Sequence, residues 1–214
     1  MAIDPAASTD VFRTVGEPET ISILVLGSKF IAHLAPSASE GNAESVLHQR
    51  SRRYSDASHH CWAHRIGRPN ALMERSSDAG EPSGTAGRPI LDTLKGAQLE
   101  NITCVVSRYF GGTKLGTGGL ARAYADAAKA VIVKARILTQ TIVRVVSIDF
   151  DHERTGIVYR ALDEFGITLQ EGRYDERAHG QIEVPNSQVA SLRERLAKLA
   201  RTGIDWREGE LKLQ

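Results

Sequence analysis

The sequence predicts an α+β protein of two domains, and three observations support this prediction. The chain has 214 residues, which exceeds the commonest size of a single domain. From Thr141 onward the apolar pattern gives the order β, α, β, β, α, β, which is the ferredoxin-like split motif. The stretch Asn101–Ala135 joins an apolar strand, a glycine-rich loop and an alanine-rich helix. We therefore expect a mobile arm at 1–19, a first domain at 20–138 and a second domain at 139–214.

The first domain begins, in this prediction, after an arm that holds two prolines and several small polar residues. Alternation predicts strands at 20–26 and 29–35, which Gly27 and Ser28 join as a hairpin. A helix at 42–54 and a strand at 58–66 follow. Residues 68–88 lack regular periodicity and are predicted to form a long loop. Pro89 suits the first position of a helix that runs to about Leu99.

The centre of the first domain is the run Ile102–Phe110, which is continuously apolar and β-branched, as in a strand buried on both faces. Five glycines occur among the nine residues 111–119. The helix that follows places one packing face at helical spacing: Leu120, Tyr124, Ala127, Val131 and Ala135. In the second domain we expect strands at 142–150, 167–174, 181–185 and 204–213, with helices at 155–165 and 188–201.

Composition excludes several protein classes. Apolar residues make up 41% and net charge is +1, which argues against a protein that coats nucleic acid generally. The charge is uneven: residues 1–139 carry 16 basic and 13 acidic side chains, whereas residues 140–214 carry 11 and 13. An anionic partner should therefore meet the first domain. No apolar run is long enough to span a bilayer and no signal peptide is evident, so we expect a cytoplasmic protein. Cys61 and Cys104 fall in predicted strands, as buried reduced thiols.

The glycine-rich loop does not fit the known nucleotide signatures. Gly111 and Gly116 have Walker spacing, but Thr117 stands where that motif requires lysine. Gly116, Gly118 and Ala121 fit a dinucleotide fingerprint, but no acidic residue follows between 127 and 147.

The charges around the loop favour a different anion site. Residues 108–136 contain six basic side chains and one acid, Asp126. Arg122 falls in the first turn of the predicted helix, where the helix dipole favours an anion over a cation. Thr85 and Arg88 lie near a second helix start. The predicted residues that bind phosphate or nucleic acid are Thr85, Arg88, Arg108, Lys114, Gly116, Thr117, Gly118, Gly119 and Arg122. Alternatively, the glycines only allow close packing, and Asp78 and Glu81 cap turns.

A metal site is not expected. His59 and Cys61 share one side of a predicted strand, but structural zinc requires four ligands and no second pair has metal-like spacing. We therefore predict no metal and no cofactor.

Four motifs in order give a family resemblance: Ser28-Lys29-Phe30-Ile31-Ala32, His59-His60-Cys61-Trp62-Ala63, Asp78-x-Gly80-Glu81-Pro82-x-Gly84-Thr85-Ala86-Gly87, and Arg108-Tyr109-Phe110-Gly111-Gly112-x-x-Leu115-Gly116-x-Gly118-Gly119-Leu120. Over roughly residues 20–136 the chain resembles the IMPACT/YigZ family, in its bacterial two-domain branch. The resemblance implies a first domain like domain 2 of a small-subunit ribosomal protein (βαββαβα-type). It also implies a ferredoxin-like second domain, similar to the last domain of the translocation elongation factor. Eukaryotic members are tied to translational control through a partner protein, but we expect no added partner-binding domain here, so the resemblance does not carry that role over to this chain. Ala79 departs from the usual Asp-Asp-Gly-Glu-Pro.

Three functions follow as hypotheses. The first is a noncatalytic regulator of translation that binds RNA or the ribosome through the basic glycine loop. The second is an enzyme, a hydrolase or transferase on a small phosphorylated or amide substrate, in which His59, His60, Asp78 and Glu81 perform acid–base chemistry. The third is a protein-interaction scaffold. We expect no membrane partner, and a monomer or weak oligomer.

Overall fold

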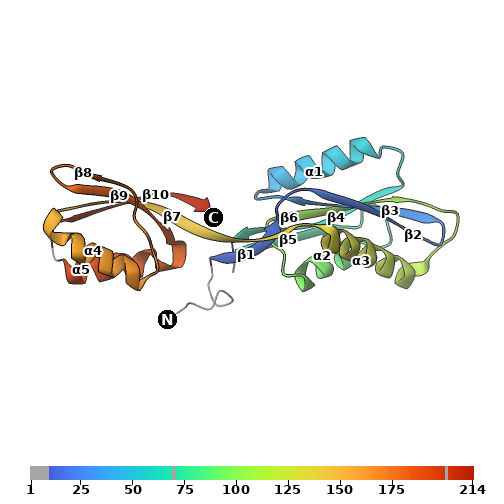
Figure 1. Cartoon of the computed structure of the whole chain (residues 1–214). Coiled ribbons are helices and arrows are strands. Elements are labelled where there is room, and N and C mark those ends of the chain that lie inside the picture. The colour runs from blue at the N-terminus through green and yellow to red at the C-terminus, as the bar shows by residue number, and fades with distance from the viewer. Residues whose placement is uncertain (1–9, 69–70, 201) are drawn as a thin grey trace. The chain divides into compact units, whose positions relative to one another are not determined.

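The computed structural model describes residues 10–68, 71–200 and 202–214. The chain divides into two compact units, one of residues 12–139 and one of residues 140–214 together with residues 10 and 11. Each unit combines helices with antiparallel strands, so the prediction of an α+β fold is confirmed (Figure 1). No helix within the described residues is long and apolar enough to cross a membrane.

The unit of residues 12–139 is built on a sheet with the strand order β2-β3-β6-β4-β5, in which each neighbouring pair is antiparallel. Figure 1 shows α1 on one face of this sheet and α2 and α3 on the other. The elements are β2 (Glu19–Val25), β3 (Ser28–Pro36), α1 (Glu40–Arg53), β4 (His59–Arg68), β5 (Ala71–Ser77), α2 (Gly87–Gly96), β6 (Ile102–Tyr109) and α3 (Gly116–Lys134).

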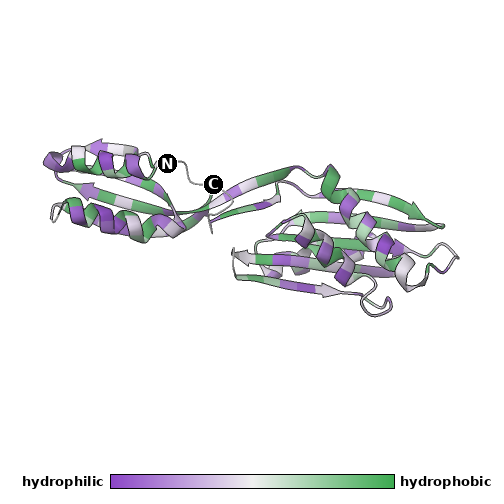
Figure 2. Ribbon diagram, turned by 90° about the horizontal axis from the view of Figure 1, so that it is seen from below, coloured by the Kyte–Doolittle hydropathy of each residue, from purple (hydrophilic) through white to green (hydrophobic). Residues whose placement is uncertain are grey.

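Strand β6 lies in the middle of this sheet, between β3 and β4, with helices on both faces. This position explains its continuous apolar sequence, and the residues from Ile102 to Arg108 are all buried. The predicted packing face of α3 is also confirmed, because Leu120, Tyr124, Ala127 and Val131 are buried. In Figure 2 the helices alternate between hydrophobic and hydrophilic residues, as expected for helices with one face on a sheet.

The prediction of a loop at residues 68–88 is wrong in its first half, because residues Ala71–Ser77 form strand β5. It is an edge strand paired only with β4, and most of its side chains are partly or fully exposed, so its sequence lacks an apolar pattern. Ion pairs support it instead. Arg65 of β4 lies opposite Glu74 in the register and contacts it at 2.9 Å, and Lys95 of α2 contacts Glu74 at 2.7 Å.

The unit of residues 140–214 has the strand order β10-β7-β9-β8, with antiparallel neighbours and two helices. This is the ferredoxin-like order that the sequence predicts. Its elements are β7 (Ile137–Phe150), α4 (Thr155–Glu164), β8 (Gln170–Tyr174), β9 (Ala178–Pro185), α5 (Val189–Leu199) and β10 (Ile204–Leu213), with short 3-10 helices at His152–Arg154 and Asn186–Gln188. Val146, Ile148, Phe150, Leu162 and Leu192 belong to its core.

The prediction of a mobile arm at residues 1–19 is wrong for residues 11–15, which form a strand. Val11–Val15 forms strand β1, which pairs with β7, and Phe12 and Val15 are buried. The N–H of Gly16 donates to the carbonyl of Arg136 at 3.0 Å, and the N–H of Ile142 donates to the carbonyl of Asp10 at 2.9 Å. The strand is only five residues long and precedes Pro18, so its apolar signal is weak. Residues 1–9 lie outside the described residues.

His33 of β3 makes the stability of this unit depend on pH. Its side chain is 7% exposed, and a hydrogen bond of 2.8 Å joins its Nδ1 to Oγ1 of Thr20 on β2. Burial, and next the positive charge of Arg50, lower the pKa of His33 to about 4. An unfolded histidine has a pKa of about 6.5. The unfolded chain therefore binds this proton more tightly than the folded chain, and acid favours unfolding.

We predict that replacement of His33 by glutamine removes part of the acid sensitivity of this unit. In the wild type, His33 should lower the free energy of unfolding progressively from about pH 6.5 to about pH 4, by up to ~3 kcal/mol. Urea titrations at several pH values, for wild type and His33→Gln, measure the difference. Because the other histidines remain in both proteins, they cancel. Parallel stability curves for the two proteins between pH 7 and pH 4 would contradict the assignment.

Candidate functional site

The candidate site lies where β6 ends and α3 begins. Helix α3 starts at Gly116, so Gly116, Gly118 and Gly119 form its first turn, whereas the sequence predicted a loop up to residue 119. Glycine has low helix propensity, which hides this start in the sequence. As a consequence Arg122 lies in the second turn of the helix and not in the first. The glycine turn proper comprises residues 111–115.

One glycine of this turn is required for packing. A Cβ on Gly111 would lie 1.9 Å from the carbonyl carbon of Gly27, in the turn between β2 and β3. Gly27 itself has a φ of +82°, in the region that favours glycine. The N–H of Gly111 donates to Oγ of buried Ser28 at 3.1 Å. At Gly111, therefore, the alternative that the glycine permits close packing is the one observed.

Arg108, at the end of β6, has an internal counter-ion. Its side chain is buried, and its Nη1 donates to Oε1 of Glu81 at 2.7 Å. The hydroxyl of Tyr124, on α3, donates to the same carboxylate oxygen at 2.7 Å. The guanidinium lies over the rings of Phe30 and Phe110, at 5.4 and 5.6 Å from their centroids. Arg108, which was expected to bind an external phosphate, is therefore already neutralised within the fold by Glu81.

The start of α2 also has an internal anion. The carboxylate of Asp78 accepts the N–H groups of Gly84, Ala86 and Gly87 at 2.8 to 2.9 Å. Burial acts to raise the pKa of Asp78, but these three N–H groups together hold that pKa below its ordinary value. The carboxylate thus occupies the position that an external anion would take, as the alternative of a capping role suggested.

Thr85 and Arg88, which the sequence placed at a second anion site, both make contacts within the local structure. The hydroxyl of Thr85 donates to the carbonyl of Pro82 at 2.6 Å, and its side chain is buried. Arg88 is exposed and pairs with Asp92, one turn along α2, at 2.9 Å. Both side chains have partners that belong to the local structure.

Among the described residues, His59, His60, Asp78 and Glu81 make their hydrogen bonds to other groups and not to one another. Nδ1 of His59 contacts the carbonyl of Ala79 at 2.9 Å, and Nδ1 of His60 contacts Oγ of Ser107 at 2.8 Å. Asp78 and Glu81 are engaged as described above. Cys61 donates to the carbonyl of Asp78 at 2.9 Å, and burial raises the pKa of its thiol to about 12. Both cysteines are free and buried. Within the described residues, no cluster of His, Cys, Asp and Glu could hold a metal ion.

A hollow of about 280 Å³ opens beside the start of α3, and we call it the glycine-turn hollow. Of the predicted residues it brings together Lys114, Gly116 and Thr117, with the buried Arg108 in its wall. Nη1 of Arg122 lies 3.7 Å from the position that a Cβ on Gly118 would occupy, so this cation reaches back to the first turn. The residues that line the glycine-turn hollow are Glu81, Pro82, Arg108, Phe110, Lys114, Leu115, Gly116, Thr117 and Leu120.

The first turn of α3 borders this hollow through Gly116 and Thr117. Leu115 is the N-cap and provides no side-chain cap. The N–H groups of Gly116, Thr117 and Gly118 precede the first N–H that the helical ladder uses. With Leu115 as the N-cap, regular helix geometry gives that first N–H to Gly119, so the free N–H groups expected at this helix start are those of Gly116, Thr117 and Gly118.

Phe110 is the residue of this site whose position the sequence did not predict. It closes the apolar run of β6 and was expected in the core, yet its side chain is 52% exposed and lines the hollow. A terminal aromatic followed by glycines was the available signal.

The structure thus defines a two-unit α+β protein in which a hollow lined by Lys114 lies beside the start of α3. Residues 26–132 match the Impact N-terminal domain family. The chain is 33% identical over 200 residues to the IMPACT family member YvyE of Bacillus subtilis, covering 94% of this chain and 92% of that protein. It is 31% identical to the IMPACT family member YigZ of Escherichia coli, over 86% and 91% of the two chains. The chain belongs to the IMPACT family, as its motifs predicted.

A solved structure supports the fold over the whole length. A protein described as hypothetical in its crystal structure aligns with 95% of this chain and 96% of its own, at a TM-score of 0.63 and 27% identity. The fold of this chain is therefore one that experiment has already found in a similar protein.

We predict that loss of Glu81 destabilises the protein strongly, because Arg108 then remains buried without its counter-ion. Glu81→Gln should lower the free energy of unfolding by about 3–5 kcal/mol. The matched control is Asp92→Asn, which breaks an exposed ion pair with Arg88 and should cost below ~1 kcal/mol. Urea denaturation of both variants measures the difference. Equal stabilities of the two variants would show that the buried pair does not constrain this site.

Proposed function

We propose that this chain is a noncatalytic regulator of translation that binds RNA, alone or in the ribosome, through phosphate groups at the start of α3. The observation that carries the proposal is the first turn of α3, which has no side-chain cap and faces a hollow lined by Lys114 and Thr117. Membership of the IMPACT family, whose eukaryotic members are tied to translational control, is consistent with it.

The chemistry of the helix start favours a phosphate. Three successive backbone N–H groups and the positive end of the helix dipole attract a negative group. Lys114 is exposed beside them, and the guanidinium of Arg122 lies near Gly118. A phosphate oxygen can accept hydrogen bonds from the backbone while the two side chains supply charge.

The exposed ring of Phe110 adds a reason to favour single-stranded RNA. Proteins that bind unpaired RNA stack bases on aromatic side chains next to a basic groove. Phe110 lines the same hollow as Lys114 and Thr117, and Arg108 lies against its ring. In this proposal Arg108 holds Phe110 in place and does not contact the phosphate itself.

We predict that the double variant Lys114→Ala/Arg122→Ala weakens binding of a labelled single-stranded RNA, and of the ribosome, roughly tenfold at moderate salt. The slope of log affinity against log salt should also fall, by about one unit for each phosphate that the variant no longer neutralises. Fluorescence anisotropy with RNA, and cosedimentation with ribosomes, between about 50 and 200 mM salt measure both effects.

The control has the same change in charge on the same unit. Arg88→Ala/Lys129→Ala removes two exposed cations that pair with Asp92 and Asp126 and lie outside the lining of the hollow. It should leave RNA affinity within about twofold of wild type, since only distant charge is removed. Equal losses of RNA affinity in the two double variants would show that only the net charge of the protein matters. This result would refute a site at the start of α3.

A further inference from the structure

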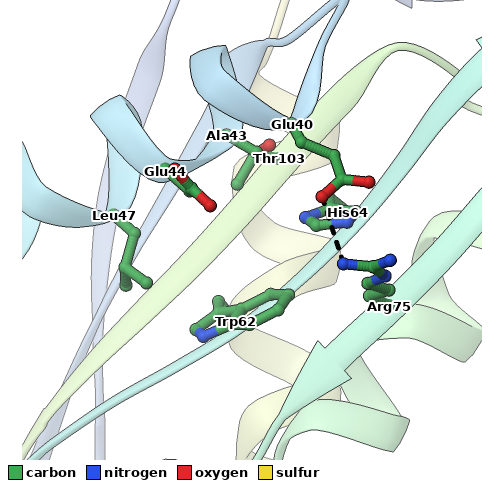
Figure 3. Close-up of a pocket in the computed structure, with 8 residues that line it drawn as sticks. All are labelled: Glu40, Ala43, Glu44, Leu47, Trp62, His64, Arg75 and Thr103. Carbon is green, nitrogen blue, oxygen red and sulfur yellow. Dashed lines mark hydrogen bonds and ion pairs between the residues drawn. The ribbon is translucent and has the colours of Figure 1, made fainter.

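A second hollow lies on the opposite face of the same sheet, under α1, and we call it the α1 hollow. It has a volume of about 280 Å³. Leu47 and Glu44 come from α1, Trp62 and His64 from β4 and Thr103 from β6. Figure 3 shows the residues of α1 facing the side chains of the two strands across this space. Helices α2 and α3 lie on the other face of the sheet (Figure 1).

Two buried polar atoms in the α1 hollow have no hydrogen-bond partner among the described residues: Nε2 of His64 and Oγ1 of Thr103. His64 is 5% exposed and Thr103 is 1% exposed. The two residues are opposite each other in the register of β4 and β6, so their side chains are neighbours on the face of the sheet that lines the hollow. Buried polar groups in native proteins are almost always paired, which makes two neighbouring exceptions informative.

The remainder of the hollow is apolar and aromatic. The rings of Trp62 and His64 stack, with centroids 5.1 Å apart and planes 20° from parallel. Leu47 and the buried Ala43 face them from α1. An aromatic platform with one apolar wall suits a flat ring, because stacking and apolar contact both depend on such surfaces.

Charge at the hollow disfavours a phosphate group. Glu40 pairs with Arg75 at 3.1 Å, and Glu44 adds a second carboxylate. Burial, and next the charge of Arg75, lower the pKa of His64, so its imidazole is neutral at neutral pH. A neutral imidazole nitrogen and a hydroxyl can each donate or accept, and a carboxylate accepts N–H groups. These groups together match a neutral ring that carries both N–H donors and acceptor nitrogens.

We propose that the α1 hollow binds a planar nitrogen heterocycle of nucleobase size, which contacts Trp62 and forms hydrogen bonds with His64 and Thr103. The base can come from a free nucleoside or from an unpaired nucleotide of RNA. This inference stands on the α1 hollow alone and does not depend on phosphate binding at the start of α3.

The test uses the fluorescence of Trp62. The chain has two tryptophans, so Trp206→Phe leaves Trp62 as the only reporter. Titration of the full chain with adenosine, guanosine, cytidine and uridine, up to about 10 mM, covers the weak affinities typical of small ligands. At least one nucleoside should change the emission saturably. No saturable change with any of the four would overturn the proposal.

Two variants in the Trp206→Phe background test the contacts. Thr103→Val keeps the shape but removes the hydroxyl, and it should weaken nucleoside binding about fivefold, the effect of one hydrogen bond. Leu47→Trp should fill the hollow and abolish binding. Thr103→Val also removes an unpartnered buried hydroxyl, so it should melt at or above the temperature of its parent. Affinities of Thr103→Val equal to those of the parent would overturn the hydrogen-bonded site, even if Leu47→Trp does not fold.

The two hollows are distinguished by measuring the binding of both nucleosides and RNA to the variants of each hollow. Lys114→Ala/Arg122→Ala should leave nucleoside affinity unchanged. A failure of RNA to bind at the start of α3 would therefore not affect the nucleoside titration. If the base comes from RNA, Thr103→Val lowers RNA affinity as well as nucleoside affinity. If it is a free nucleoside, Thr103→Val lowers nucleoside affinity alone. Equal loss of nucleoside binding in Lys114→Ala/Arg122→Ala and in Thr103→Val would overturn the assignment to the α1 hollow.

Discussion

The ion pair between Arg108 and Glu81 is the interaction on which the candidate site depends. It joins the end of β6 to the loop before α2, and Tyr124 adds α3 through the same carboxylate oxygen. Nη2 of Arg108 also contacts Oγ of Ser28 at 3.3 Å, which adds the start of β3. Both charged side chains are buried. Such a pair adds little net stability relative to apolar residues, but it strongly disfavours any arrangement in which one partner is left alone. The pair therefore specifies where the glycine turn begins.

The two carboxylates of the motif before α2 have internal partners. Asp78 satisfies the start of α2 and Glu81 satisfies Arg108, so these carboxylates maintain the fold. Among the described residues no carboxylate is seen to accept an N–H of the first turn of α3, and its N-cap, Leu115, makes no side-chain capping hydrogen bond. The two helix starts thus differ: the N–H groups at the start of α2 bind the carboxylate of Asp78, whereas the start of α3 borders a hollow.

The sequence allowed the fold class, the ferredoxin-like unit and the packing face of α3 to be predicted, because these depend on apolar periodicity. It did not allow β5 to be predicted, because ion pairs such as Arg65 with Glu74 support that edge strand. Within the candidate site, Lys114 and Thr117 were predicted and line the hollow, whereas Arg108 was assigned to an external phosphate. A sequence contains the charges but not their partners, and Glu81 lies 27 positions away from Arg108.

Amide hydrogen exchange at the start of α3 tests the account most directly. If the N–H groups of Gly116, Thr117 and Gly118 have no internal acceptor, they should exchange rapidly, while those of the buried turns that follow are protected. Addition of a single-stranded RNA should then slow their exchange selectively. Protection of these three N–H groups in the protein alone, or exchange rates that RNA leaves unchanged, would contradict an open anion site at this helix.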